Sequence, residues 1–173
     1  MKIKDTNNIP KYKRILDELF SYKIQIGIFG NSGNYKDGTS ILLIANVNEF
    51  GCQIKVTEKM RNYLRAVGLP LRNDTEYINI PERSFIRSGF DSKQKDIESR
   101  SISLLKKVLL MELDVHTYYD LLGDYIAGQL KDYMTDIDSP PNHPYTIKSK
   151  GSSNPLIDSE RLIQSITHRV VKA

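Results

Sequence analysis

Two apolar stripes at helical spacing occupy the second half of the chain and constrain its fold more than any other feature. Residues three and four apart share one side of an α-helix, so each stripe predicts a long helix that buries one face. Asp114 is typical of a residue that caps a helix N-terminus, and it places the break between the two helices near residues 113–116. The stripes consist of Ile97, Ile102, Leu105, Val108, Leu109 and Leu113, and of Leu122, Tyr125, Ile126, Leu130 and Tyr133.

Four other segments alternate in hydropathy or are rich in β-branched residues, which predicts strands near residues 23–29, 51–57, 76–80 and 166–171. Shorter helices are predicted over residues 9–21, from Thr39 or Ser40 to Phe50, over 58–66, over 84–90 and after Asp158. Gly51 ends the second of these helices, and Pro81 ends the third strand because proline cannot donate to a strand ladder. The expected fold class is α+β, with a small, mostly antiparallel sheet packed against the long helices of residues 92–137.

Residues 138–155 are rich in proline, with four prolines in eighteen residues. Proline favours extended backbone, so this segment is predicted to form a long extended arm. Arms of this length within a compact domain are usually functional or disordered. A chain of 173 residues predicts one domain, to which the arm belongs.

Charge and cysteine content exclude several classes of protein. Lys and Arg outnumber Asp and Glu by 25 to 21, with both signs interspersed, which is compatible with proximity to DNA but not typical of a dedicated DNA-binding face. The single cysteine, Cys52, excludes an intramolecular disulfide. The N-terminus is polar and the longest apolar run is residues 41–45, so we expect a soluble, intracellular product without a signal peptide or membrane span.

No catalytic or metal-binding motif is present at the spacing that its chemistry requires. The loop of residues 30–40 has Gly33 and Gly38 at phosphate-loop spacing, but Thr39 stands where such a loop needs lysine, which favours a flexible loop before a capped helix. None of the three histidines has a second histidine or cysteine at ligand spacing. Asp120 and Asp124 share a helix face, which we interpret as a solvated face. The sequence therefore shows no catalytic constellation, and we do not expect a metal site.

Three separated motifs together point to a family. They are Asn48-Glu49-Phe50-Gly51, Ile80-Pro81-Glu82-Arg83-Ser84-Phe85-Ile86-Arg87, and the segment 154–166, which follows Pro140-Pro141 and Tyr145-Thr146-Ile147-Lys148. Their order and spacing resemble the neck, head–tail connector and tail-completion proteins of tailed bacteriophages, including the Mu-like virion morphogenesis proteins. Members of that family carry "His-Glu-Phe-Gly", "Ile-Pro-x-Arg-Pro-Phe" and "Pro-Leu-x-Asp-Thr-Gly-x-Leu-x-x-Ser-Ile". The resemblance covers about residues 20–171.

The chain departs from the family pattern at several positions. Asn48 replaces the family histidine, Ser84 replaces the second proline, and Ser159-Glu160 replaces Thr-Gly. The aspartate at 158 is retained, so the last helix is still expected to begin there. Residues 57–75 resemble an insertion that only some members carry.

The resemblance implies a structural protein without catalytic activity or cofactor. It implies a homo-oligomeric ring, of six or twelve copies, between the DNA-filled head and the tail tube. The implied partners are portal, adaptor or head-completion proteins on one side and tail-terminator or tail-tube proteins on the other, with transient contact to viral DNA in the lumen and no membrane. The protein would be found in the virion neck, and in the host cytoplasm during assembly. Tail-terminator and head-completion roles remain open, and a small DNA-binding or DNA-processing protein is the alternative from another class.

The candidate interface residues follow from these motifs. Arg83 and Arg87 lie four apart and are predicted to present guanidinium groups to carboxylates of a neighbouring subunit. Phe85 between them is either an apolar anchor at that interface or part of the chain's own core. The proline-rich arm would lose little entropy on docking, and its Tyr145 and Lys148 would contact either a protein or single-stranded nucleic acid. The complete set is Glu49, Phe50, Arg83, Phe85, Arg87, Tyr145, Lys148, Asp158 and Arg161.

Overall fold

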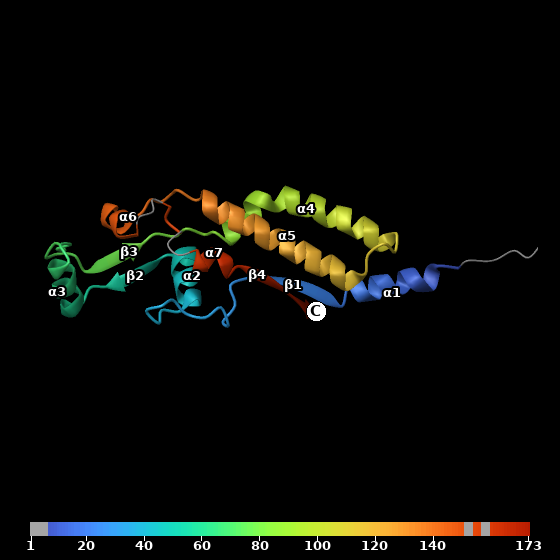
Figure 1. The fold of residues 1–173 in the computed structure, drawn as a ribbon, viewed down its shortest axis with the longest axis horizontal. Helices are drawn as coiled ribbons and strands as arrows, with labels where there is room; N and C mark the ends of the chain where they lie inside the picture. The colour runs from blue at the N-terminus through green and yellow to red at the C-terminus, as the bar shows by residue number, and fades with distance from the viewer. Residues whose placement is uncertain (1–6, 151–153, 157–159) are drawn as a thin grey trace, which may run out of the picture.

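The computed structural model describes residues 7–150, 154–156 and 160–173. The molecule is elongated, and two long antiparallel helices lie along its axis (Figure 1). These are α4 (Arg87–Leu109) and α5 (Val115–Asp136), joined by a short turn. Both predicted stripes lie in helices, and the turn of residues 110–114 overlaps the predicted break. The first stripe is only partly correct, because Leu113 falls in the turn and Ile102 and Leu109 are 55% and 38% exposed.

Four antiparallel strands accompany the helices. β1 (Tyr22–Gly27) pairs with β4 (Thr167–Lys172), with Tyr22 opposite Lys172 and Gly27 opposite Thr167. β2 (Cys52–Lys55) pairs with β3 (Tyr77–Ile80). The α+β prediction is confirmed, but the strands form two separate two-stranded sheets. Only the β1–β4 sheet packs on α5, because the β2–β3 ribbon extends away from the long helices toward the far end of the molecule (Figure 1).

Five shorter helices complete the described part of the chain. α1 (Ile9–Leu19) projects at one end of the molecule, and α3 (Glu58–Ala66) lies at the other, beyond the β2–β3 ribbon (Figure 1). α2 (Ile41–Phe50) ends at Gly51 as predicted. The remaining two are α6 (Pro144–Lys150) and α7 (Arg161–Gln164).

The prediction of an extended arm is wrong over residues 144–150, which form α6. Pro144 occupies the first position of that helix, where proline is favoured because its missing N–H would have no intrahelical partner. Residues 137–143, which include Pro140 and Pro141, are not helical. The proline content therefore predicted the non-helical connection of residues 137–143 but not the helix α6 that follows it.

The hydrophobic core lies mainly between α4, α5 and the β1–β4 sheet. Its largest fully buried side chains are Phe85, Leu130, Met134, Ile166, Val108 and Val115. Partly buried side chains of α1, β1 and α2 pack against its edge. Among the helices that the structure describes, none has an apolar stretch long enough to cross a membrane.

Asp114 caps α5 through two hydrogen bonds. The backbone N–H of Thr117 donates to Asp114 Oδ1 at 2.9 Å, and the Thr117 hydroxyl donates to Oδ2 at 2.6 Å. These bonds, first the one from the Thr117 side chain and then the one from its backbone, lower the pKa of Asp114 below its ordinary value of 3.8. Because the folded-state pKa is the lower one, the carboxylate stabilises the fold above the unfolded-state pKa, and this contribution is lost as the pH falls through the folded-state pKa.

We expect Asp114→Ala to lower the free energy of unfolding by about 1 kcal/mol at neutral pH, the usual loss for a helix cap. The difference from the wild type should shrink at pH values well below 3.8, where the wild-type carboxyl is also protonated. Urea unfolding at neutral and acidic pH measures both quantities. Asp114→Asn is the control, because an amide oxygen can still accept from the Thr117 N–H, and an equal loss in both variants would contradict the capping role.

Candidate interface site

Three segments that are far apart in the sequence meet where α4 begins. They are the end of α2, the connection of residues 81–86 between β3 and α4, and residues 140–142 before α6. Two buried charged side chains, Glu49 and Arg83, hold them together, with 5% and 6% of their surfaces exposed. The first two motifs and the double proline of the sequence analysis are therefore neighbours in space.

Glu49 binds the N-terminus of α4. Its Oε2 accepts from the backbone N–H of Ile86 at 2.9 Å, and its Oε1 accepts from the backbone N–H of Arg87 at 3.0 Å. The first N–H groups of a helix have no intrahelical acceptor, and no side chain of α4's own N-cap supplies one here. A carboxylate is favourable at this position because the helix dipole is positive there. Glu49 thus fixes α4 to the end of α2.

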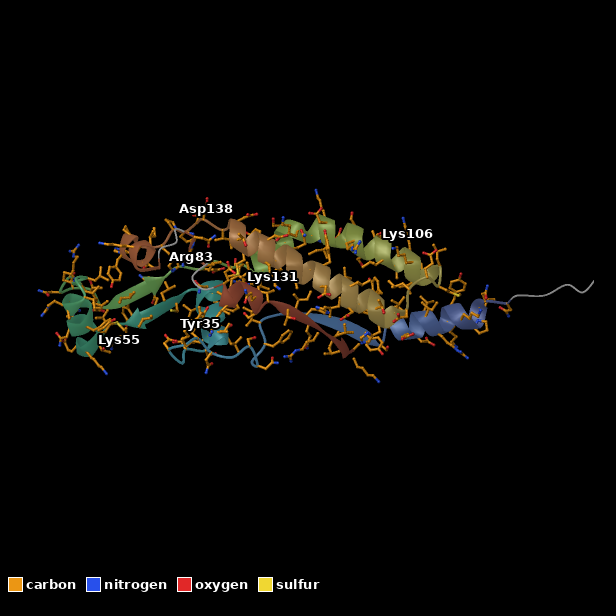
Figure 2. All side chains as sticks on the ribbon, viewed as in Figure 1. Tyr35, Lys55, Arg83, Lys106, Lys131 and Asp138 are labelled. Atoms are coloured by element: carbon orange, nitrogen blue, oxygen red, sulfur yellow. The ribbon has the colours of Figure 1, made fainter. Side chains whose placement is uncertain are left out.

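Arg83, which is labelled in Figure 2, binds the segment before α6. Its Nε donates to the carbonyl oxygen of Pro140 at 2.8 Å, and its Nη2 donates to the carbonyl of Pro141 and to Oδ1 of Asn142, both at 3.3 Å. The backbone N–H of Arg83 donates to the carbonyl of Asn48 at 2.7 Å. Burial lowers the pKa of this guanidinium, whose side-chain bonds all go to uncharged oxygens.

The exposed part of this junction is formed by Phe50, Arg87 and Glu82. Phe50 is 60% exposed, and the guanidinium of Arg87 lies 4.6 Å from the centre of its ring. Arg87 also donates to Glu49 Oε1 at 3.0 Å and to Glu82 Oε1 at 2.8 Å. Its pKa is raised, chiefly by the hydrogen bond to Glu49. A shallow hollow of about 300 Å³ lies beside Phe50, lined by residues 50–53, 79, 80 and 82.

These contacts correct the interpretation of three candidate residues. Phe85 is completely buried, so of its two predicted roles the structure assigns it to the chain's own core. Arg83 is buried in its own chain, where its guanidinium binds residues 140–142. Arg87 finds its carboxylates in its own chain, at Glu49 and Glu82. Of the residues at this junction, Phe50 keeps the exposure that an interface anchor requires.

The other candidates lie around the C-terminal part of the chain. Tyr145 is 40% exposed on α6, where Lys148 is also exposed. Arg161 Nη1 donates to the carbonyl of Asn34 at 3.0 Å, which ties α7 to the loop before α2. Asp158 lies outside the described residues.

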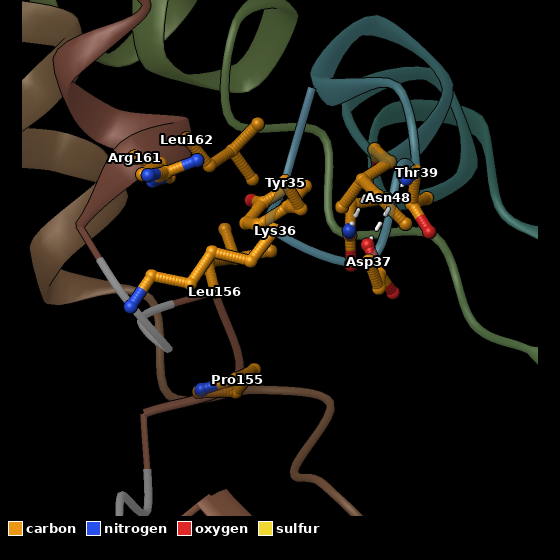
Figure 3. A pocket seen from close by; sticks show the side chains of 10 residues that line it. Tyr35, Lys36, Asp37, Thr39, Asn48, Pro155, Leu156, Arg161 and Leu162 are labelled. Atoms are coloured by element: carbon orange, nitrogen blue, oxygen red, sulfur yellow. Dashed lines mark hydrogen bonds between the residues drawn. The ribbon is translucent and has the colours of Figure 1, made fainter.

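A cavity of about 490 Å³ lies between the loop before α2, α2 itself and the segment around α7. Figure 3 shows the side chain of Lys36 extending away from Asp37 and Thr39, toward the side of the cavity where Arg161 and Leu156 lie. The Thr39 N–H donates to Asp37 Oδ1 at 3.0 Å, and this bond is the first of the causes that lower the pKa of Asp37. The loop of residues 30–40 thus contacts α7 through Asn34 and, with α2 and α7, lines this cavity.

A histidine bound by two aspartates was not anticipated from the sequence. Nε2 of His168 on β4 lies 2.9 Å from Asp120 Oδ1, and Nδ1 lies 3.3 Å from Asp124 Oδ1. Gly123 lies beneath the ring, where a Cβ atom would come within 2.3 Å of His168 Cδ2. The side chains of Asp120 and Asp124 are 57% and 74% exposed, as predicted for a solvated face, and each also contacts His168 on β4. The sequence does contain a glycine, Gly123, between Asp120 and Asp124, which leaves room for a side chain to pack there. Nothing in the sequence links this position to residue 168.

Among the residues that the structure describes, no three His, Cys, Asp or Glu side chains are grouped so that they could hold a metal ion. No protein-family model, curated protein or solved structure matches the chain.

We expect Arg83→Lys to lower the free energy of unfolding by about 2 kcal/mol, because a single ammonium group cannot reproduce the bonds of the guanidinium fork and leaves buried carbonyl groups without a donor. Amide hydrogen exchange over residues 138–143 should accelerate more than elsewhere. Arg161→Lys is the matched control, since Arg161 is exposed and also donates to a backbone carbonyl. Unchanged exchange over residues 138–143 in Arg83→Lys would show that Arg83 does not hold this segment.

Proposed function

We propose that this protein is a structural component of a tailed-bacteriophage virion, forming a ring at the head–tail junction through which DNA passes. The observation that carries the proposal is the spatial meeting of the motifs behind the family resemblance. Glu49 from the first motif binds the start of α4, and Arg83 from the second binds residues 140–142. These residues thus share one structural task, which is to fix the orientation of α2, α4 and the arm.

The exposed Phe50 supports an assembly role for this junction. It presents an apolar ring beside a hollow of about 300 Å³ that Glu82 also lines, and the guanidinium of Arg87 lies 4.6 Å from the centre of the ring. Interfaces commonly combine a central aromatic anchor with a polar rim. Since Arg87 is already bound to Glu49 and Glu82, its role here is to hold Phe50 in place for a neighbouring subunit.

The proposed assembly is a ring of six or twelve copies, with portal, adaptor or head-completion proteins on the head side and tail-terminator or tail-tube proteins on the tail side. A ring subunit must keep its shape while pressed between two partners. The buried bonds of Glu49 and Arg83 supply rigidity at the point where α2, α4 and the arm meet. No turnover is expected from such a protein, because its work consists of binding.

The proposal is tested by making virions in which this chain is deleted or carries Phe50→Asp. We expect filled heads and free tails that fail to join, and we expect cryo-electron microscopy of wild-type particles to place the protein in the neck. Tyr63→Asp on α3, also an exposed aromatic residue, is the matched control and should assemble normally. Complete, infectious particles without this chain would overturn the proposal. Density confined to the head vertex or to the end of the tail would instead assign head completion or tail termination.

A further inference from the structure

Helix α1 carries an apolar stripe that the rest of the described chain leaves exposed. Ile9 is 75% exposed, Tyr12 41% and Leu16 48%, and Phe20 directly after the helix is 82% exposed. Their spacing of three, four and four residues places them on one side of the helix. Exposed large apolar side chains are common singly, but a continuous row of four along one helix marks an interaction surface.

The same helix contacts the body of the molecule along the neighbouring edge of the stripe. Ile15 and Leu19 pack against the edge of the core, and the hydroxyl of Tyr119 on α5 donates to the carbonyl of Leu19 at 2.6 Å. The helix projects beyond the ends of α4 and α5 (Figure 1). Its bare stripe is therefore held in a defined orientation at one end of the molecule, within reach of another protein.

Two opposite charges flank this stripe on its outer edge. Lys13 and Asp17 are both exposed and lie four residues apart, so they follow one another along the same side of the helix. In the part of the chain described by the structure, neither of them has a partner within ion-pair distance. Lys13 lies toward the N-terminus of α1 and Asp17 toward its C-terminus. If two such helices pair antiparallel, the lysine of each lies opposite the aspartate of the other.

We propose that α1 pairs antiparallel with α1 of a second copy of this chain, about a two-fold axis level with residue 15. Residues 13 and 17 are equally far from that level, so each Lys13 lies opposite Asp17 of the second copy. The stripe of Ile9, Tyr12, Leu16 and Phe20 is buried against its own image, as a two-fold interface requires. Because α1 projects from one end, the two molecules extend in opposite directions from the contact.

A helix of eleven residues offers a small contact area, below that of stable protein–protein interfaces. We therefore expect a dynamic dimer with a dissociation constant of about 1–100 μM. A closed contact between two copies does not build a ring, so this inference goes beyond the proposed function and does not depend on it.

Charge reversal in the full chain tests the pairing by sedimentation velocity over a concentration series. Lys13→Glu and Asp17→Lys should each weaken the dimer by about tenfold or more, because each places like charges opposite one another in both symmetric positions. An equimolar mixture of the two variants should regain dimers. In the mixed dimer, the carboxylate introduced at position 13 faces the ammonium group introduced at position 17, and the native Asp17 of the first variant faces the native Lys13 of the second. Pairing within one helix cannot produce this rescue.

Arg14→Glu makes the same change of charge on the opposite side of α1, so it is the matched control and should dimerise as the wild type does. Circular dichroism establishes that each variant keeps its helical content before association is compared. A wild-type chain that stays monomeric throughout the series would overturn the inference. The same holds if Arg14→Glu weakens association as much as Lys13→Glu, or if the mixture gains no dimers over the separate variants. A ring-shaped oligomer unaffected by Lys13→Glu would overturn the α1 pairing while leaving the proposed function standing.

Discussion

Replacing Phe85 with alanine is expected to lower the free energy of unfolding by about 3–5 kcal/mol, the range for truncating a buried phenylalanine. The side chain is completely buried, so its removal leaves a cavity as well as losing its transfer free energy from water. Phe50→Ala at the same junction should cost less than about 1 kcal/mol, because that ring is already 60% exposed. The two variants thus distinguish a core phenylalanine from a surface phenylalanine at the same junction.

Equilibrium unfolding in urea gives both values, and the slope of the free energy against urea concentration should stay the same in each variant if only stability changes. Phe50→Ala should fold normally but reduce incorporation into virions. If Phe85→Ala proved as stable as the wild type, Phe85 would not be a core residue, and the assignment of the junction would be wrong.

The secondary structure followed closely from local patterns in the sequence. The stripes of α4 and α5, the cap at Asp114 and the stop at Gly51 are signals contained within a few residues, and each element formed where these signals placed it. The limits of β1, β2 and β4 differed by only a few residues, as expected for strand ends. What local patterns did not contain was the division of the strands into two sheets, which depends on how distant segments pack.

The contacts of the candidate site were also not predictable from local patterns, because they join distant segments. Arg83 and Arg87 were predicted to bind carboxylates of a neighbouring subunit. In the structure Arg83 binds oxygen atoms of residues 140–142, and Arg87 binds Glu49 and Glu82 of its own chain. A sequence shows that arginines and a carboxylate are present, but not which of them face one another after folding. The bond from Arg83 to Pro140 spans 57 residues, and the contact of His168 with Asp120 spans 48. Contacts over such separations produce no periodic pattern in the sequence, so they could not be predicted from it.

Gly51→Ala is expected to lower the free energy of unfolding by more than about 3 kcal/mol, because backbone strain and a steric clash add together. Gly51 has φ of 67° and ψ of 170°, a conformation that is essentially restricted to glycine and costs other residues about 1–3 kcal/mol. An added Cβ would also come within 2.9 Å of the backbone nitrogen of Glu82 and of the carbonyl oxygen of Ile80. Backbone atoms cannot rotate away as a side chain can, so the connection from β3 to α4 would have to move.

Gly68→Ala distinguishes these two contributions. Gly68 also has a positive φ, of 84°, but no atom lies within 4 Å of where its Cβ would be, so only the strain of about 1–2 kcal/mol should remain. A displacement of the β3–α4 connection in Gly51→Ala would also loosen the bonds from Glu49 to Ile86 and from Arg83 to Pro140, because both depend on residues 80–87 keeping their place. Hydrogen exchange over residues 80–87 and 138–143 should therefore accelerate together in Gly51→Ala and remain unchanged in Gly68→Ala. Equal destabilisation of the two variants would mean that the close packing at Gly51 contributes nothing to stability. It would also mean that the β3–α4 connection can move without loss, although the buried bonds of Glu49 and Arg83 are proposed to fix it.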